Sequence, residues 1–243
     1  MTIAKNEFEF IHFETIDSTN NYAKTLCKLG LTNKVIIADT QTAGRTTKKQ
    51  GWISPKGNLY FTILTKLDDE KKLPEYAFLS ALAIAQSIEQ IDTNKNSIKI
   101  KWPNDILLNK QKLCGILIEK EENSVIIGIG LNINSSPAPE LTRYPTTALS
   151  KNKINILPTD LAKIILEKFI NNINIRNNEN FEKIISFITP YMYKFGEEIH
   201  ISSQNQTLTG KFCGLDKTGA LILDTGNETK KIISGELTKE NFL

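Results

Sequence analysis

The chain has 243 residues, of which 40% are hydrophobic, and a formal net charge of +3. A chain of this length and composition can bury one large core and still form a small second domain. Its apolar residues come in short runs between charges, and none approaches the roughly 20 apolar residues that span a bilayer. The composition therefore predicts a globular protein without a membrane segment.

The N-terminus and the cysteines exclude further classes. Glu7 stands where a secretory signal needs an apolar run, which predicts a cytoplasmic protein. Cys27, Cys114 and Cys213 are odd in number and form no CxxC pair, so neither a disulfide framework nor a zinc site is expected. The modest positive charge is spread along the chain and does not by itself indicate nucleic-acid binding.

The first part of the chain predicts strands interspersed with two helices. Polar residues at 17–20 are typical of a helix N-terminus, and Gly30 ends that helix. Residues 76–91, rich in Ala, Leu and Ile, predict a second helix. Strands are expected at 8–13, 34–38, 58–66, 97–101, 106–109, 112–120 and 125–133. This order predicts an α+β fold with a mixed central β-sheet that carries helices on one face.

The C-terminal part changes character. A helical region is expected at 157–187, with an Asn-rich interruption near 171–180, and Pro190 ends it. Short alternating strands follow at 198–202, 206–215, 220–223 and 229–234. They predict a small SH3-like β-barrel. We therefore expect two domains, residues 1–190 and residues 191–243.

A polar loop at 40–57 is too long to be a mere connection, and it contains Gly44, Arg45 and Trp52. Backbone amides near Gly44 and the Arg45 guanidinium suit phosphoryl oxygens, and an indole can pack on an aromatic ring. A solvated loop whose tryptophan anchors it to the core fits the same residues. The loop alone does not decide between these interpretations.

Polar residues near the later strands suit an anionic ligand. Asp105 suits Mg²⁺, although Asn104 and Asp105 also suit a local Asx turn. Lys112 precedes an apolar strand and would neutralise a substrate carboxylate, whereas a solvated hairpin lysine is the commoner alternative. Gly128 and Gly130 permit close approach of a ligand to the backbone but lack the spacing of a dinucleotide fingerprint.

Six motifs, taken in order, resemble the biotin protein ligase family from about residue 13 to residue 237. They are DSTN at 17–20, QTAGR at 41–45, WISPKGNLY at 52–60, KWPND at 101–105, KLCGIL at 112–117 and GIGLNIN at 128–134. The segments at 214–221 and 235–236 look like the SH3-like cap of that family. The resemblance implies an enzyme that joins biotin to AMP, with ATP and Mg²⁺, and then transfers biotin to an acceptor lysine.

The resemblance also implies residue roles. Ser18, Thr19 and Gln41 would bind the ureido ring of biotin, whose donors and acceptor need fixed polar partners. Arg45 and Lys112 would be catalytic and face the biotin carboxylate and the α-phosphate. The family places Trp52, Asn104 and Asn132 beside the nucleotide, Asp105 beside the metal, and Asn20, Gly44 and Gly115 in the binding site.

The implied acceptor is a biotin carboxyl carrier protein of acetyl-CoA carboxylase or another biotin-dependent carboxylase. Pairing through the edge of the central sheet is frequent in the family, so a homodimer is compatible with the resemblance. Only about a dozen residues precede the first motif, too few for a winged helix-turn-helix, so DNA binding is not expected.

The chain departs from the family in the loop, where Thr46 and Thr47 replace the second Gly and the second Arg, and Lys49 replaces a later Gly. We therefore expect a less tightly closing loop, with Lys48 or Lys49 as a partial substitute for the lost charge.

Three alternatives remain at this point. A lipoate or octanoate transferase has the same general fold, although Ser18, Thr19 and Gln41 and the motif that ends in Asn104 and Asp105 favour biotin. A catalytically degenerate binding protein is conceivable from the altered loop, but the retained Arg45, Asp105 and Lys112 argue against it. A nucleic-acid-binding module built on the C-terminal barrel would need a basic, aromatic face. Residues 195–243 carry as many acids as lysines in places and do not indicate such a face.

Overall fold

A computed structural model describes residues 4–47, 51–142, 144–204 and 206–242. Its centre is a seven-stranded sheet with the strand order β1-β2-β3-β7-β6-β5-β4. β1 pairs with β2 in parallel and the other neighbours are antiparallel. The strands are β1 (Glu9–Ile16), β2 (Lys34–Gln41), β3 (Leu59–Lys66), β4 (Ile98–Lys101), β5 (Asp105–Leu108), β6 (Gln111–Glu121) and β7 (Ser124–Leu131). The predicted mixed sheet is confirmed.

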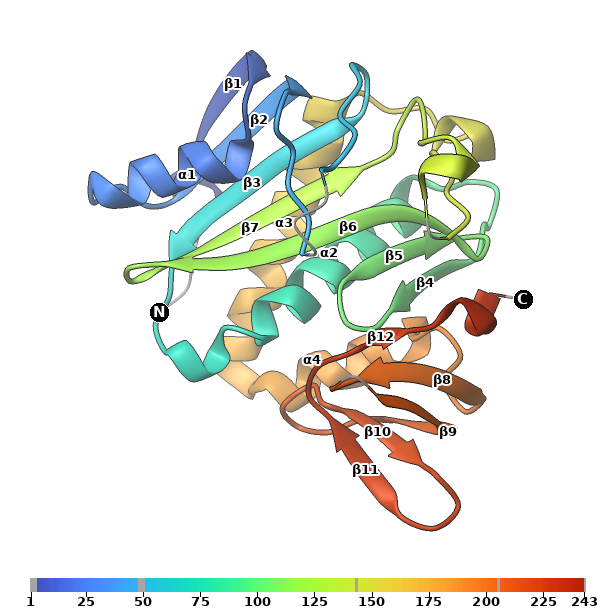
Figure 1. Cartoon of the computed structure of the whole chain (residues 1–243). Helices are drawn as coiled ribbons and strands as arrows, with labels where there is room; N and C mark the ends of the chain where they lie inside the picture. The colour runs from blue at the N-terminus through green and yellow to red at the C-terminus, as the bar shows by residue number, and fades with distance from the viewer. Residues whose placement is uncertain (1–3, 48–50, 143, 205, 243) are drawn as a thin grey trace.

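Helices cover the two faces of this sheet unequally (Figure 1). One face packs against α2 (Glu75–Ile91), α3 (Pro158–Glu179) and α4 (Phe181–Ile188) through the main apolar core, to which Ile127 of β7 belongs. The opposite face carries α1 (Thr19–Lys28), where Ala23 and Leu26 pack with Ile126. Most helical cover thus lies on one face, as expected, and α1 alone lies on the other.

The termini of α1 follow from its sequence. Ser18 occupies the N-cap position with an extended backbone, but its side chain makes no capping hydrogen bond. At the other end Gly30 has a φ of 72°, its N–H bonds to the Cys27 carbonyl at 2.8 Å, and the Leu31 N–H bonds to the Leu26 carbonyl at 3.0 Å. This is a Schellman motif, which confirms the predicted stop at Gly30.

The Asn-rich segment of the long helical region differs from the expectation. Residues 171–179 continue α3 without a break, and the interruption is confined to Asn180, whose φ is 107°. Asn172 is fully buried within this stretch and donates to Gln86 of α2 at 3.2 Å. Tertiary packing therefore overrides the weak helix preference of asparagine here.

The C-terminal strands form a five-stranded antiparallel sheet with the order β11-β10-β9-β8-β12. They are β8 (Glu198–Ser203), β9 (Gln206–Leu215), β10 (Leu221–Asp224), β11 (Thr229–Ile232) and β12 (Glu236–Leu237). The small C-terminal β-domain is thus confirmed, and the two-residue β12 was not foreseen. The small domain packs against the large one: the indole N–H of Trp102 donates to the carbonyl of Gly219, which lies between β9 and β10, at 3.2 Å.

Single turns of 3₁₀ helix complete the described structure at Lys5–Glu7, Glu70–Lys72, Pro139–Leu141, Ser150–Asn152, Thr189–Tyr191 and Lys239–Phe242. Within the described ranges, no helix combines the length and the apolar character needed to cross a bilayer.

Candidate active site

A cavity of about 480 Å³ opens on the α1 side of the central sheet. Its walls come from the start of α1, the loop after β2, the strands β5, β6 and β7, and the segment that leads from β11 into β12. The sequence-predicted residues that line it are Ser18, Thr19, Asn20, Gln41, Arg45, Trp52, Asn104, Asp105, Lys112, Gly115 and Asn132. The fold thus gathers residues that lie more than a hundred positions apart in the sequence.

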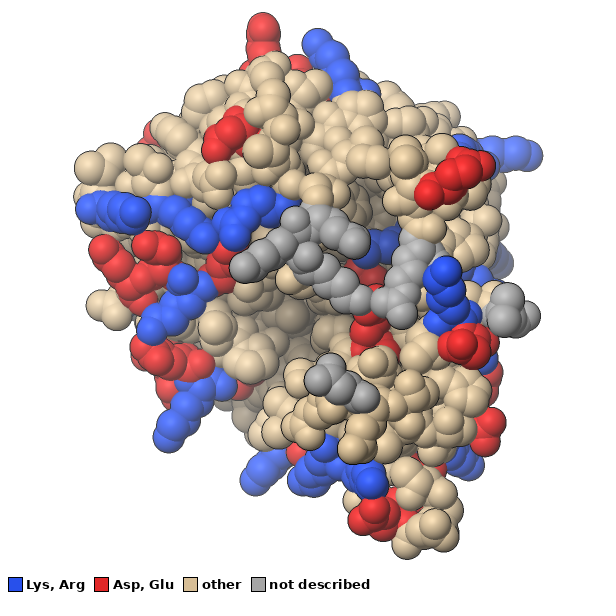
Figure 2. Space-filling model, viewed as in Figure 1, with Lys and Arg blue, Asp and Glu red and all other residues tan. Residues whose placement is uncertain are grey.

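The charges around this cavity are mixed. Figure 2 shows basic and acidic side chains of the described residues interspersed over the face that carries the cavity.

Glycines make up much of the floor of the cavity, and side chains lie directly on them. A Cβ added to Gly130 would come within 2.6 Å of the Trp52 ring, and one added to Gly115 would come within 3.0 Å of it. A Cβ at Gly128 would lie 2.3 Å from the Asn20 side chain. Any side chain at these positions would displace Trp52 or Asn20. Gly128 and Gly130 therefore leave room for the side chains of Asn20 and Trp52, whereas the sequence analysis expected them to leave room for a ligand.

Trp52 is placed by the loop rather than by the core alone. Its backbone N–H bonds to the Gly44 carbonyl at 2.9 Å, and a Cβ at Gly44 would lie 2.6 Å from the Trp52 carbonyl oxygen. Gly44 therefore supports Trp52 from behind and is not itself among the cavity-lining residues. The indole N–H of Trp52 is buried and has no acceptor among the described residues. A buried donor of this kind is available to a bound ligand.

A polar cluster forms at the start of α1. The backbone N–H and the hydroxyl of Thr19 donate to the Gln41 side-chain oxygen at 2.9 and 3.2 Å. The Thr62 hydroxyl lies 2.8 Å from the Thr19 hydroxyl and 2.6 Å from the Asn20 amide oxygen. Ser18 is buried beside them and lines the same cavity. These fixed donors and acceptors can recognise a small polar ring.

A second cluster surrounds Asp105. The register between β5 and β6 shifts so that Ile106 pairs with Cys114 and Leu107 pairs with Lys112. This β-bulge turns Lys112 to the face on which Asp105 lies. The Lys112 ammonium is 2.7 Å from one oxygen of Asp105. Lys112 thus lines the cavity and pairs with Asp105, so it is not a hairpin lysine free in solvent.

Asp105 also pairs with a second lysine that the sequence analysis did not single out. The ammonium of Lys101, whose side chain is only 3% exposed, lies 3.2 Å from the other oxygen of Asp105. Burial raises the pKa of Asp105, but the ammonium groups of Lys112 and Lys101 outweigh burial and leave that pKa below its ordinary value. Asp105 is therefore a carboxylate that holds two cations.

These contacts do not fit the expected role of Asp105 as a metal ligand. Each of its oxygens already has an ammonium partner, and Mg²⁺ needs oxygen ligands that cations do not occupy. Among the described residues no group of three or more His, Cys, Asp or Glu side chains is placed to hold a metal ion. The described side chains around Asp105 therefore do not fit a metal ion held by the protein.

Arg45 has a different partner from Lys112. Its guanidinium contacts both oxygens of Glu119, at 3.0 and 3.1 Å, and the side chain of Asn21 at 3.2 Å. Both cations line one cavity, but each is held by its own carboxylate. Lys48 and Lys49, the expected substitutes for the missing arginine, lie outside the described residues.

The two predicted asparagines are anchored by backbone carbonyls. The Asn104 amide donates to the Ile116 carbonyl at 2.8 Å, and the Asn132 amide donates to the Thr147 carbonyl at 3.0 Å. The Asn104 bond crosses to β6, so it is not a local Asx turn. Both side chains line the cavity with their amide nitrogens already bonded.

The C-terminal domain contributes residues that sequence reasoning missed. Glu236 of β12 lines the cavity, lies 3.9 Å from the Lys101 ammonium and accepts a hydrogen bond from Tyr144 at 2.9 Å.

The sequence analysis also missed Glu119 of β6 and Thr62 of β3, which contact the polar residues at the start of α1. Strand alternation was the available signal, because Glu119 is an even number of residues from Gly115 and so shares its face.

Comparison with known proteins agrees with this geometry. The sequence profile of the biotin/lipoate A/B protein ligase family matches residues 12–134. The chain belongs to this family. The profile of the biotin protein ligase C-terminal domain matches residues 194–237, which include all five strands of the small sheet. The resemblance carried by the six motifs is thereby confirmed.

Individual relatives cover most of the chain. The bifunctional ligase/repressor BirA of Bacillus subtilis is 32% identical over 93% of this chain and 73% of its own length. A biotin–[acetyl-CoA-carboxylase] ligase of Paracoccus denitrificans is 28% identical over 85% of this chain and 90% of its own. The biotin protein ligase of Aquifex aeolicus, solved with biotin and ATP, has a TM-score of 0.85, is 26% identical, and is matched over 95% of this chain and 97% of its own.

Proposed function

We propose that this protein is an ATP-dependent biotin protein ligase that forms biotinyl-AMP and transfers biotin to a lysine of an acceptor protein. One observation carries the proposal. A single cavity combines the Thr19–Gln41 polar cluster with the cation pair around Asp105. A molecule with a polar ring and a carboxylate at opposite ends fits such a site, and the relatives named for biotin supply the identity of that molecule.

In the first step, the formation of biotinyl-AMP, different residues bind biotin and neutralise its charge. Thr19 and Gln41 hold the ureido ring, while Lys112 neutralises the carboxylate as its oxygen attacks the α-phosphorus of ATP and pyrophosphate leaves. Lys112 can act there without reorganisation because Asp105 already fixes it. Trp52 covers the cavity floor and offers its indole N–H to the bound intermediate.

The second step needs positioning more than further chemistry. The neutral amine of an acceptor lysine attacks the carbonyl carbon of the mixed anhydride, the amide bond forms, and AMP departs with the electrons of the broken C–O bond. Holding the anhydride at a fixed place contributes most of the acceleration in reactions of this kind. We propose as acceptor a biotin carboxyl carrier domain of acetyl-CoA carboxylase or another biotin-dependent carboxylase, as the names of relatives suggest.

The proposal is tested by incubating the protein with ATP, Mg²⁺ and labelled biotin, with and without a biotin carboxyl carrier domain. We expect biotin-dependent release of pyrophosphate and label on the acceptor lysine. Lipoate and octanoate, tested in parallel with a lipoyl domain, should support neither. Label transfer from lipoate alone would replace the biotin assignment with the lipoate alternative, and no transfer from any of the acids would favour a binding protein.

A further inference from the structure

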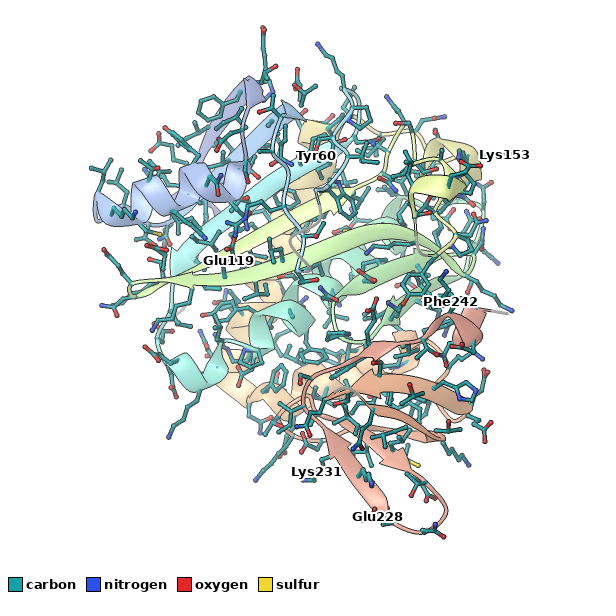
Figure 3. All side chains as sticks on the ribbon, in the orientation of Figure 1. Tyr60, Glu119, Lys153, Glu228, Lys231 and Phe242 are labelled. Atoms are coloured by element: carbon teal, nitrogen blue, oxygen red, sulfur yellow. The ribbon has the colours of Figure 1, made fainter. Side chains whose placement is uncertain are left out.

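Glu119 near the end of β6 contacts more of the site than any described function explains. Its side chain is only 15% exposed and lies next to α1 (Figure 3). One oxygen accepts from the Asn20 amide at 2.8 Å and the other lies 2.7 Å from the Lys24 ammonium. Both oxygens also contact Arg45, at 3.0 and 3.1 Å. One carboxylate thus joins α1, β6 and the loop after β2.

The contacts with Arg45 fix its orientation. A guanidinium has five N–H groups in a rigid plane. Glu119 and Asn21 engage both N–H groups of Nη1 and one of Nη2, and no described residue accepts from the other two. A bidentate carboxylate holds the plane of the guanidinium, so those two N–H groups keep a defined direction at the cavity wall.

The same carboxylate also fixes Asn20 from the side opposite Thr62. The Asn20 amide nitrogen donates to Glu119, and its oxygen lies 2.6 Å from the Thr62 hydroxyl. Burial raises the pKa of Glu119, but Lys24, Asn20 and Arg45 outweigh burial and leave its pKa below the ordinary value. The carboxylate is therefore ionised at neutral pH and remains a partner for both residues.

We propose that Glu119 is a positioning residue that orients Arg45, and with it the base of the loop after β2, for binding the acid that is activated. The inference rests on the proposed function, and on the role that the family resemblance implies for Arg45, which is to face the carboxylate of that acid. Glu119 itself does not touch the substrate and acts through Arg45. Its neighbour Lys24 contacts the same carboxylate from α1 and serves as the matched control.

The test is a double-mutant cycle on biotin-dependent ATP–pyrophosphate exchange. We expect Glu119→Gln to raise the KM for biotin about tenfold, with a smaller effect on kcat. Arg45→Ala should lose at least as much, and adding Glu119→Gln to it should cause little further loss. Lys24→Met, which removes another ion pair of Glu119, should lower the melting temperature but leave the KM for biotin within about twofold.

Two outcomes would overturn the inference. An equal loss from Glu119→Gln with and without Arg45 would mean that Glu119 does not act through Arg45. An unchanged or lower KM in Glu119→Gln would mean that Glu119 is irrelevant to Arg45 or restrains it. Exchange by the wild-type protein decides the proposed function separately. If only lipoate or another acid supports exchange, the same cycle run with that acid tests Glu119.

Discussion

The two faces of the central sheet are built from the same strands but differ in what their side chains do. On β7, Ile127 lies in the core that α2 and α3 cover, whereas Gly128 and Gly130 form part of the floor of the cavity. The core face gains stability from burying apolar volume. The cavity face lacks side chains at the places where Trp52 and Asn20 lie. The cavity therefore lies where β7 has no side chains to contribute to packing.

The largest effect that would test this comparison comes from the cavity face. Lys112→Ala should lower kcat for biotinyl-AMP formation about 10³-fold, because the charge acts where the carboxylate attacks the α-phosphorus. The Kd for ATP should change far less. Single-turnover release of pyrophosphate measures the first quantity and equilibrium ATP binding the second.

Lys110→Ala is the matched control for this prediction, because Lys110 is an exposed lysine on the same hairpin. It should leave both quantities unchanged. Pyrophosphate release by Lys112→Ala at the wild-type rate would remove Lys112 from the chemistry.

A pair of substitutions on adjacent faces of β7 separates stability from binding. Ile127→Ala on the core face should lower the free energy of unfolding by about 2–5 kcal/mol and leave the KM for biotin nearly unchanged. Gly130→Ala on the cavity face should displace the Trp52 ring and raise the KM for ATP or biotin about tenfold, with a smaller loss of stability. Urea unfolding and steady-state kinetics check the pair, and the reverse pattern would contradict the division of roles between the faces.

The loop after β2 contributes Thr46 and Thr47 to the cavity wall, and changing these two residues tests how tightly the loop holds the intermediate. An arginine at position 47 could add charge-assisted bonds of about 1.5–3 kcal/mol each, which threonine cannot supply. The double variant Thr46→Gly, Thr47→Arg should therefore release preformed biotinyl-AMP at least about tenfold more slowly. The dissociation rate measured by stopped flow is the test. Equal rates would show that other residues already close the loop.

The smallest expected effect is a pH dependence that belongs to the cavity face alone. The pKa of Glu119 is lowered in the folded protein, whereas an unfolded glutamate titrates near about 4.3. Its stabilising contribution is therefore present above about pH 4.3 and is lost as the pH falls through the folded pKa. Glu119→Gln should cost about 1–2 kcal/mol at pH 7 and progressively less below about pH 4. The loss from Ile127→Ala should not vary with pH, and parallel curves would contradict the assignment.

The local pattern of the sequence determined much of the molecule. Strand alternation and helical spacing predicted the mixed sheet, and the turn and helix signals located α1, its stop at Gly30, and the small C-terminal sheet. The six motifs identified most of the residues that line the cavity. These features depend on residues close together in the sequence, whose side-chain direction follows from the backbone period.

Only the tertiary structure decided which residues hold those side chains in place. Arg45 and Glu119 are 74 residues apart, and their ion pair depends on how α1 and the loop pack on β6. Similarly, the bulge between β5 and β6 turns Lys112 toward Asp105, and β12 brings Glu236 from the C-terminal domain to the cavity. A period of two separates the faces of a strand, but it does not say which face a helix covers or which distant charge will be its neighbour.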